Sequence, residues 1–333
     1  AGISGSKEGL PHLPDGIFQP PMEMSCVERH FKDKMEGYFV DRKLIISRTA
    51  NLTEPTEEQL ALGRSKCQFR NECMRGCSFG AYFSSQSATL PAAERTGNLT
   101  IVTDTLAHSV TYDAATKKAT GVRVIDAKTK ETREYNAKVI FLCASTLSST
   151  QIMLNSTSEY FPNGIANSSG VLGHYLMDHV FHAGARGKLK IEENRYYSGR
   201  RPNGVYIPRF QNLSDDDPNF IRGYGYEGWS SREGWGRLTN SAEYGANFKK
   251  SLQSPGEWEF EIMGFGEMLP RFENHVRLDQ DNLDPLGMPL LHVSCEHSDN
   301  EKAMQQSMKE EAVEMLNVSG FHDVEGYART RPP

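Results

Sequence analysis

The sequence predicts a mixed α+β or α/β fold in which helices and antiparallel strands share the chain. Three observations support this prediction. Residues 98–155 form a succession of short β-patterned segments, a small meander, and end in a strand–turn–helix pattern. From about residue 182 glycine, aromatic and polar residues mix without helical periodicity, and 257–263 and 275–279 alternate like strands. Residues 299–316 then carry apolar side chains at helical spacing.

The first part of the chain is predicted to be a lead-in of loop and helix. Proline and glycine punctuate residues 1–25, which favours loop. Apolar residues at four-residue steps predict a helix over 26–39, and the apolar triplet at 44–46 predicts a short strand. A helical stretch over 84–95 is ended by Gly97.

Strands are predicted to dominate the next part of the chain. The turn residues between them place these strands at 99–103, 108–112 and 121–126. Residues 138–143 are continuously apolar, which is the pattern of a strand buried on both faces of a sheet. Ser145 follows as an N-cap residue for a helix over 147–154.

Length and charge exclude some classes of protein. The chain has 333 residues, enough for one large domain or two. Lys and Arg number 37 against 43 Asp and Glu, and the net charge of −6 disfavours nucleic-acid binding through a general basic field. No apolar run approaches the roughly 20 residues of a membrane span. The chain opens at Ala1 without a signal peptide and stops at Pro333, so we expect both ends to be cuts within a longer protein.

The sharpest chemical feature is the spacing Cys67-x5-Cys73-x3-Cys77. Three thiols in a glycine-punctuated loop can converge on one soft metal centre. No histidine lies near enough in sequence to complete a Cys3His zinc site, and a three-thiol set suits a three-iron cluster better than a four-ligand zinc. The alternative is that these are reduced or disulfide-paired cysteines lining a tight loop.

Two further groups of residues have both a chemical and an ordinary interpretation. His174, Asp178 and His179 are close in sequence, and can do acid–base or metal chemistry or form a helix-cap or loop network. Three tryptophans can line a sugar-stacking cleft or pack as core aromatics: Trp229, Trp235 and Trp258.

Several segments together resemble the glucose–methanol–choline (GMC) flavin oxidoreductases between about residue 60 and residue 316. The resemblance rests on the order and spacing of Cys77–Ala81, Ser87–Thr100, Gly121–Val124, Ala144-Ser145 with Leu147–Ser156, Gly164–Gly173, Asp178-His179, Asn274–Asp279 and Asp284–Pro289. The cysteine spacing is also similar to that of the catalytic subunits of FAD-dependent glucose and glucoside dehydrogenases, in which a three-iron, four-sulfur (3Fe–4S) cluster sits near the flavin.

The resemblance implies an organisation for the chain. Residues 1–60 are a lead-in segment, 61–181 a partial FAD-binding domain with the cysteine loop, and 182–333 a substrate-binding domain whose antiparallel sheet is covered by helices. The positions that match the family's FAD-binding positions are Ala107, Ala144, Ser145, Asp178 and His179. Cys67, Cys73 and Cys77 match the ligands of the cluster. His174-Tyr175 departs from the Asn-led sequence of many relatives, and Cys143 replaces a commoner Ala or Gly.

The family pattern is also incomplete in this chain. The Gly-x-Gly-x-x-Gly turn that holds the FAD pyrophosphate is absent from the sequence, as is the C-terminal segment with the catalytic histidine. The resemblance therefore places no catalytic residue in this chain, and we expect no turnover and weak or no FAD binding from it alone.

For the full-length protein the resemblance implies oxidation of a sugar, glucoside or other alcohol by hydride transfer to FAD. An electron-accepting protein such as a cytochrome is the implied partner if a cluster is bound, and a periplasmic location is then favoured over the cytoplasm. Two alternatives remain, which are an oxygen-using oxidase without an iron–sulfur cluster and a non-catalytic carbohydrate-binding or interaction module.

Overall fold

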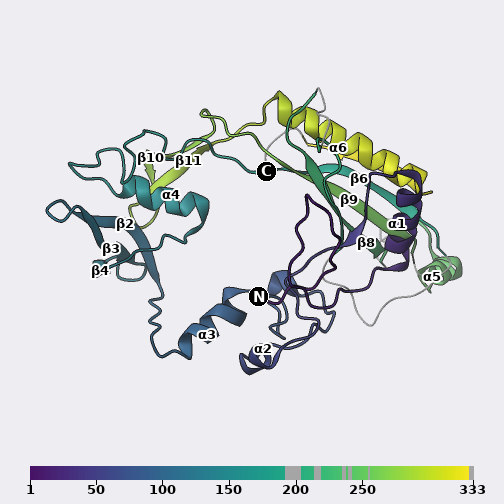
Figure 1. Ribbon diagram of the computed structural model, residues 1–333, viewed down its shortest axis with the longest axis horizontal. Helices are drawn as coiled ribbons and strands as arrows, with labels where there is room; N and C mark the ends of the chain where they lie inside the picture. Colours follow the sequence, from purple (N-terminus) through teal and green to yellow (C-terminus); the bar gives the residue numbers. More distant parts are fainter. Residues whose placement is uncertain (192–203, 214–218, 235–237, 239–241, 254–255, 330–333) are drawn as a thin grey trace. The chain divides into compact units, whose positions relative to one another are not determined.

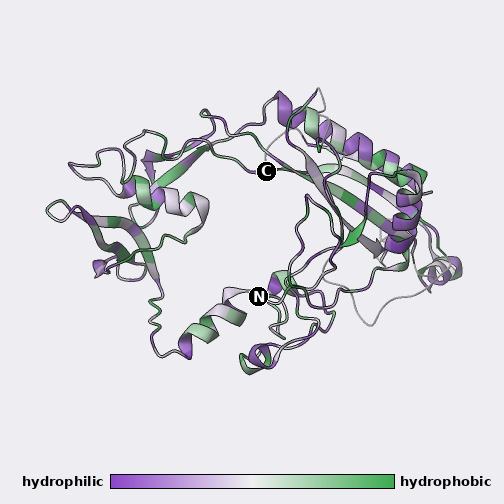
Figure 2. Ribbon diagram, viewed as in Figure 1, coloured by the Kyte–Doolittle hydropathy of each residue, from purple (hydrophilic) through white to green (hydrophobic). Residues whose placement is uncertain are grey.

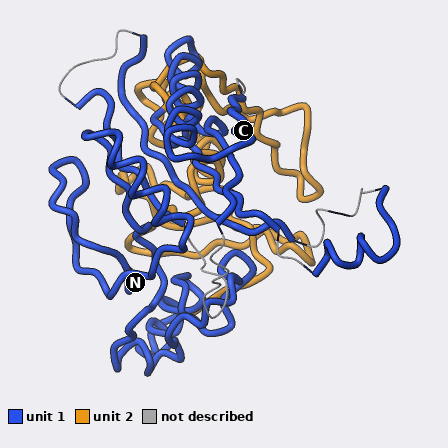
Figure 3. Tube along the Cα trace, turned by 90° about the vertical axis from the view of Figure 1, so that its right-hand side faces the viewer, with its two compact units in different colours: residues 1–99, 179–267, 298–331 blue, residues 100–178, 268–297, 332–333 orange. Residues whose placement is uncertain are grey.

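The chain forms two compact units, each assembled from segments that are distant in sequence (Figures 1 and 3). The computed structural model describes residues 1–191, 204–213, 219–234, 238, 242–253 and 256–329. Unit 1 contains residues 1–99, 179–267 and 298–331, and unit 2 contains residues 100–178, 268–297 and 332–333. The division at 60/61 and 181/182 stays a sequence-based prediction, and both units draw residues from more than one of its segments.

Unit 1 is organised around one antiparallel sheet. In the described part of the chain its strands follow the order β1-β7-β8-β9-β6-β12, with β5 pairing with β9. The strands are β1 (Ile45–Ile46), β5 (His179–Val180), β6 (Ala183–Leu189), β7 (Val205–Ile207), β8 (Tyr224–Arg232), β9 (Trp258–Glu267) and β12 (His322–Ala328). The long central strands β8 and β9 form the middle of the sheet, and β6 links them to β12.

Two helices cover one face of this sheet. Helix α1 (Cys26–Tyr38) packs against β8 and β9, and helix α6 (Asp299–Val318) packs against β6, β9 and β12 (Figure 1). Along β9 every second residue from Trp258 to Gly266 is buried, whereas Glu259 and Glu267 on the other face are exposed. Figure 2 shows the corresponding alternation of hydrophobic and hydrophilic residues along α6. The second face of the sheet is therefore left to polar and aromatic side chains.

Local sequence signals explain why both helices form where they do. Ser25 is the N-cap of α1, and together with Glu28 it forms a capping box in which each side chain accepts a hydrogen bond from the backbone N–H of the other residue. Ser298 and Glu301 form a capping box at the start of α6. The buried side of α1 then places the ring of Phe31 at a centroid distance of 4.8 Å from Phe260 of β9. These caps satisfy backbone N–H groups that a helix start leaves without partners.

The remaining helical segments of unit 1 are short or lie outside this layer. They are α2 (Glu57–Ala61), a 3₁₀ turn (Cys73–Arg75), a π-helical turn (Ser85–Thr89), α3 (Leu90–Glu94) and α5 (Gly245–Gln253). No helix in the described residues is long and apolar enough to cross a membrane.

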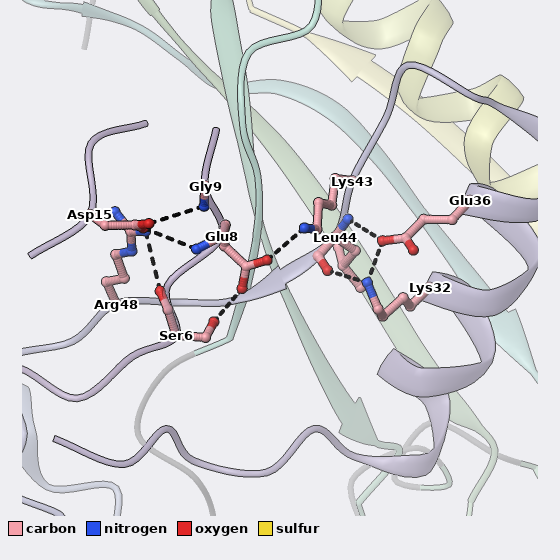
Figure 4. A network of polar contacts seen from close by, with 9 residues as sticks. All are labelled: Ser6, Glu8, Gly9, Asp15, Lys32, Glu36, Lys43, Leu44 and Arg48. Atoms are coloured by element: carbon pink, nitrogen blue, oxygen red, sulfur yellow. Dashed lines mark hydrogen bonds and ion pairs between the residues drawn. The ribbon is translucent and has the colours of Figure 1, made fainter. Parts of the chain in front are cut away.

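The N-terminal lead-in is fastened to the residues on either side of β1 by a polar network (Figure 4). Lys43 Nζ lies 2.8 Å from Glu8 Oε2, and Arg48 Nη2 lies 2.7 Å from Asp15 Oδ1. Asp15 also accepts hydrogen bonds of 3.0 Å from the backbone N–H groups of Glu8 and Gly9. These charged side chains thereby add to the backbone hydrogen bonds between Ser4 and Thr49 that hold this loop.

We expect this attachment to be lost in acid. The backbone N–H groups of Glu8 and Gly9, together with Arg48, hold the pKa of Asp15 below its usual 3.8. Because the pKa is lower in the folded state, the stabilisation is present above the unfolded pKa and is lost as the pH falls through the folded value. The protection factors of residues 1–20 against hydrogen exchange, which correct for the intrinsic exchange rate at each pH, should therefore fall as the pH is lowered from above 3.8 through the folded pKa of Asp15. Asp15→Asn should show low protection factors over the whole pH range.

The exposed Asp33 of α1 provides a matched control, since Asp33→Asn should keep the wild-type pH response. Protection factors of residues 1–20 that stay constant in the wild type as the pH is lowered below 3.8 would contradict the prediction.

Unit 2 contains a three-stranded meander, a helix and a hairpin. Their bounds are β2 (Thr105–Asp113), β3 (Lys118–Asp126), β4 (Thr132–Asn136), α4 (Ser145–Asn155), β10 (His275–Leu283) and β11 (Pro289–Ser294). The helix is tied to both sheets, because Ser156 Oγ accepts a 2.8 Å bond from the Val110 backbone and Gln151 donates a 2.8 Å bond to the Pro289 carbonyl. All strand pairs here are antiparallel.

The mixed helix and antiparallel-strand content expected from the sequence is confirmed. The predicted helices at 26–39, 147–154 and 299–316 correspond to α1, α4 and α6, although Ala144 rather than Ser145 occupies the cap of α4. Strands β2, β3, β9 and β10 contain the predicted strand segments.

Two strand predictions are wrong. Residues 99–103 and 138–143 adopt no strand, and several of their apolar side chains are exposed, among them Val139 at 65% and Phe141 at 82%. A strand requires a neighbour to take up its backbone hydrogen bonds, and no described segment pairs with either stretch. The apolar composition of these stretches is typical of a strand, but it does not show whether another strand lies beside them.

Candidate cofactor and metal sites

The cysteine loop is an irregular segment of unit 1 that backbone hydrogen bonds hold in place. Cys67 N–H donates to the Leu52 carbonyl over 2.8 Å, and Gly80 N–H donates to the Cys77 carbonyl over 2.9 Å. Gly76 and Gly80 have positive φ values of 87° and 57°, which their lack of a Cβ accommodates in this tight loop. Glycine at these positions lets the chain turn between the thiols.

The three thiols of this loop share one environment. Cys67 is buried in a cluster with Met22, Ile46 and Ala81, and Cys77 packs against the same cluster. Burial raises the pKa of the Cys67 thiol, and the charges of Cys73 and Cys77 raise it further, so the three sulfurs are within electrostatic reach of one another.

Neighbouring polar groups approach the same thiols. The side-chain N–H of Asn51 lies 3.5 Å from Cys73 Sγ. The guanidinium of Arg64 is held under the loop by bonds to the Gly80 and Ala81 carbonyls, and its pKa is lowered by burial and raised by the charge of Cys77. Thiolates formed here would meet a hydrogen-bond donor and a buried cation.

That Cys67, Cys73 and Cys77 bind a metal cluster stays a prediction. All six cysteines of the chain are free thiols. Among the described residues no group of three or more His, Cys, Asp or Glu side chains is arranged to hold a metal ion. The loop thus supplies three reduced thiols with suitable chemistry for iron, gathered near one another but not in ligating geometry.

The residues expected to meet FAD are all surface residues, divided between the two units. Ala107 lies in β2 beside a bulge, and Ala144 and Ser145 form the start of α4. Asp178 is the last residue of its segment in unit 2, and His179 opens β5 in unit 1. All five are exposed.

The start of α4 has features that fit a phosphate-containing cofactor. Ser145 has a φ of 66°, which is uncommon for a residue with a Cβ, and begins an 11-residue helix whose first turn is exposed. The first N–H groups of a helix lack intrahelical partners and attract anions. The residues present therefore suit one end of FAD, whereas the glycine-rich turn that would complete the pyrophosphate site is not in the sequence.

The histidine that departs from the family pattern has a structural environment of its own. The ring of His174 stacks on Phe272 at a centroid distance of 3.9 Å, and His174 Nδ1 lies 2.7 Å from the Phe272 carbonyl oxygen. His179 approaches the edge of Phe265 at 6.1 Å. The rings of His174 and His179, which the sequence grouped with Asp178, thus lie against different phenylalanines.

The exposed apolar stretch before α4 leads to a prediction about solubility. Val139 and Phe141 are 65% and 82% exposed in an extended segment, and such a segment is a template for aggregation. The double variant Val139→Thr, Phe141→Ser should remain monomeric at higher concentration than the wild type with an unchanged melting temperature. Light scattering and thermal melting measure the two quantities.

As the matched control, Val124→Thr alters a buried residue of β3 and should lower the melting temperature instead. If the double variant melts earlier than the wild type, the stretch is packed in solution and the prediction is wrong.

Sequence reasoning did not identify a cavity on the uncovered face of the unit 1 sheet. It has a volume of about 560 Å³ and is lined by side chains of β6, β8, β9 and β12, among them Arg186, Trp229 and Glu259. Of the three tryptophans considered from the sequence, Trp229 is 38% exposed and lines this cavity, Trp258 is buried, and Trp235 lies outside the described residues. The strand alternation of β9 was visible in the sequence, but its neighbours across the sheet were not.

Comparisons with known proteins relate part of the chain to one protein family. Residues 54–181 match the family model described as GMC oxidoreductase. The chain is 27% identical over 226 residues to "2-methyl-1,2-propanediol dehydrogenase" of Mycolicibacterium austroafricanum, covering 65% of this chain and 40% of that protein. It is 23% identical over 268 residues to "Fructose dehydrogenase large subunit" of Gluconobacter japonicus, covering 79% of this chain and 47% of that protein. The chain thus spans less than half the length of these relatives.

Proposed function

We propose that this chain, whose residues 54–181 match the GMC oxidoreductase family model, is the central part of an FAD-dependent dehydrogenase that oxidises a sugar or another alcohol. The observation that carries the proposal is the family match together with two dehydrogenases among the relatives, one named for a diol and one for a sugar.

The proposed roles of the chain's own residues are binding and positioning. The first backbone N–H groups of α4, beginning at Ser145, would hold part of the FAD, with Ala107, Ala144, Asp178 and His179 lining it. The Ala144 N–H itself donates to Ser149 Oγ over 3.2 Å. When bound, FAD supplies hydride acceptance from the carbon that bears the substrate hydroxyl. The open face of the unit 1 sheet would shape the substrate region. None of the chain's residues is assigned as the catalytic base.

We further propose that Cys67, Cys73 and Cys77 hold a 3Fe–4S cluster that relays electrons to an acceptor protein such as a cytochrome. The support is the spacing of the three cysteines, their free state and their shared environment. Burial of Cys67 favours a metal centre shielded from water, and the nearby Asn51 amide supplies the kind of hydrogen bond that tunes cluster sulfur.

Anaerobic reduction of the full-length, flavin-loaded protein tests the enzymatic proposal. We expect the flavin absorbance to bleach with at least one member of a panel of glucose, fructose, methyl glucosides and short diols. No bleaching with any of them would overturn the proposal. Reoxidation by oxygen at the same rate as by an artificial acceptor would instead indicate the oxidase alternative.

The 333-residue chain provides a separate check on cofactor binding. We expect it to retain little or no FAD after gel filtration, because the glycine-rich turn is absent from its sequence. Stoichiometric yellow protein from this chain alone would contradict that expectation.

A further inference from the structure

Two histidine rings of unit 2 lie next to each other at the start of the β10–β11 hairpin (Figure 1). The segment that contains His174 runs beside β10, where Val276 N–H donates to the Gly173 carbonyl over 2.8 Å. His174 is thereby bridged to His275, the first residue of β10. The two ring centroids are 5.4 Å apart, with an angle of 30° between the ring planes.

Backbone carbonyl groups determine which nitrogen of each ring carries a proton. His174 Nδ1 lies 2.7 Å from the Phe272 carbonyl oxygen, and His275 Nδ1 lies 2.6 Å from the Glu273 carbonyl oxygen. A carbonyl oxygen only accepts hydrogen bonds, so each Nδ1 is the donor. In the neutral imidazole Nε2 therefore keeps its lone pair. Histidines that bind metal ions commonly donate their other ring N–H to a carbonyl or a carboxylate in the same way.

Packing and hydrogen bonds hold the two rings in position. The ring of His174 stacks on that of Phe272 at a centroid distance of 3.9 Å and an angle of 9°. Asn274, which precedes His275, is 2% exposed, and its side chain donates to the Glu296 carbonyl over 3.1 Å and accepts from the Glu296 N–H over 3.0 Å. Ligands held in this way lose little conformational freedom on binding. Both histidines are also partly exposed, so an ion from solution can reach them.

From this arrangement we propose that His174 and His275 bind one divalent transition-metal ion through their Nε2 atoms. Two imidazoles that bind an ion at about 2.1 Å in a tetrahedral arrangement have ring centroids about 5 Å apart, close to the separation of these two rings. No third His, Cys, Asp or Glu side chain of the described residues completes a metal site with them, so water fills the remaining positions. The site needs neither flavin nor an iron–sulfur cluster and goes beyond the proposed function.

The ligand atoms select the class of ion. Imidazole nitrogen suits Zn²⁺, Ni²⁺ and Cu²⁺, whereas Mg²⁺ and Ca²⁺ take oxygen ligands. In the part of the chain that the structure describes, the hydrogen bonds of both rings go to backbone carbonyls rather than to carboxylates. The pair is therefore expected to bind the first group of ions and not the second.

Titration of the 333-residue chain with Ni²⁺, followed by calorimetry and by NMR of isotope-labelled histidine rings, tests the site. We expect the Nε2 signals of His174 and His275 to broaden first, and Mg²⁺ at the same concentrations to leave them unchanged. The variants His174→Asn and His275→Asn retain an amide N–H for the backbone carbonyl but lack Nε2. Each should lower the Ni²⁺ affinity about tenfold or more. The matched control is His292→Asn in β11, whose exposed ring lies 6.5 Å from that of His275 and which should bind as the wild type does.

Several results would overturn the inference. One is the absence of any Ni²⁺ response at either ring in chain whose thermal melt shows it folded, including the case in which Ni²⁺ binds only thiols and gives a thiolate charge-transfer band. Unchanged affinity in both His174→Asn and His275→Asn, or an equal response to Mg²⁺, would be as decisive. An equal loss of affinity in His292→Asn would contradict the two-histidine assignment. Failure of the enzymatic proposal is a separate outcome, because it appears as unreduced flavin in the full-length protein and leaves Ni²⁺ binding unaffected.

Discussion

Replacing Cys73 by serine in the full-length protein is expected to remove its iron–sulfur signal completely. A serine hydroxyl does not replace a thiolate as an iron ligand, and the loop offers only the three thiols of Cys67, Cys73 and Cys77. Iron and sulfide analysis should fall from about three irons per chain to background, with loss of the three-iron EPR signal. Flavin reduction by substrate should persist, whereas electron transfer to a protein acceptor should stop.

Cys143→Ser is the control for this experiment, because Cys143 is an exposed thiol in unit 2, outside the loop. It should leave iron content unchanged. Flavin-containing wild-type protein without iron would refute the cluster proposal, and the oxygen-using alternative would then gain support. Undiminished iron in Cys73→Ser would refute the assignment of this thiol as a ligand.

Replacing Gly184 by valine is expected to destabilise unit 1 strongly. Gly184 lies in β6 opposite Met263 of β9, and a Cβ at this position would be 2.1 Å from the Ile262 carbonyl oxygen. Backbone cannot move away as a side-chain tip can, so the two strands would have to separate. The cost of such overpacking is about 3 kcal/mol or more. We expect a fall in melting temperature on the order of 10 °C for a body of this size.

The matched control is Gly37→Ala in α1, where an added Cβ meets nothing within 4 Å. This variant should melt at the wild-type temperature or slightly above it, since alanine is favoured over glycine in a helix. A melting temperature of Gly184→Val within about 2 °C of the wild type would show that β6 and β9 are less closely paired than the structure indicates.

Local patterns in the sequence were enough to locate the elements that carry their own signals. Helix α6 combines a Ser298 cap with apolar residues at helical spacing, and α1 does the same from Ser25. The cysteine spacing likewise required no structure to be noticed, because its meaning lies in residues close together in sequence. The resemblance to the GMC family came from the order of such local segments, and the family match over 54–181 confirms it.

What the sequence could not decide was pairing between distant segments. Residues 138–143 have the composition of a buried strand, yet Phe141 is exposed because strand formation depends on a neighbour that no described segment supplies. Strands β6, β8 and β12 have weak patterns of their own and were not predicted individually. Strands β6 and β8 pair with β9, and β12 pairs with β6, while α6 packs against β6 and β12.

The candidate sites likewise contain features that the sequence predicted and features that only the structure showed. The sequence by itself determined the three thiols, the mixed helix and strand content and the resemblance to an oxidoreductase family. Only the tertiary structure decided that Arg186, Trp229 and Glu261 stand side by side on one sheet face, 32 to 75 positions apart in the chain. The physical reason is that side-chain chemistry is local to each residue, whereas a binding cavity depends on cross-strand register, which is fixed by the packing of the whole sheet.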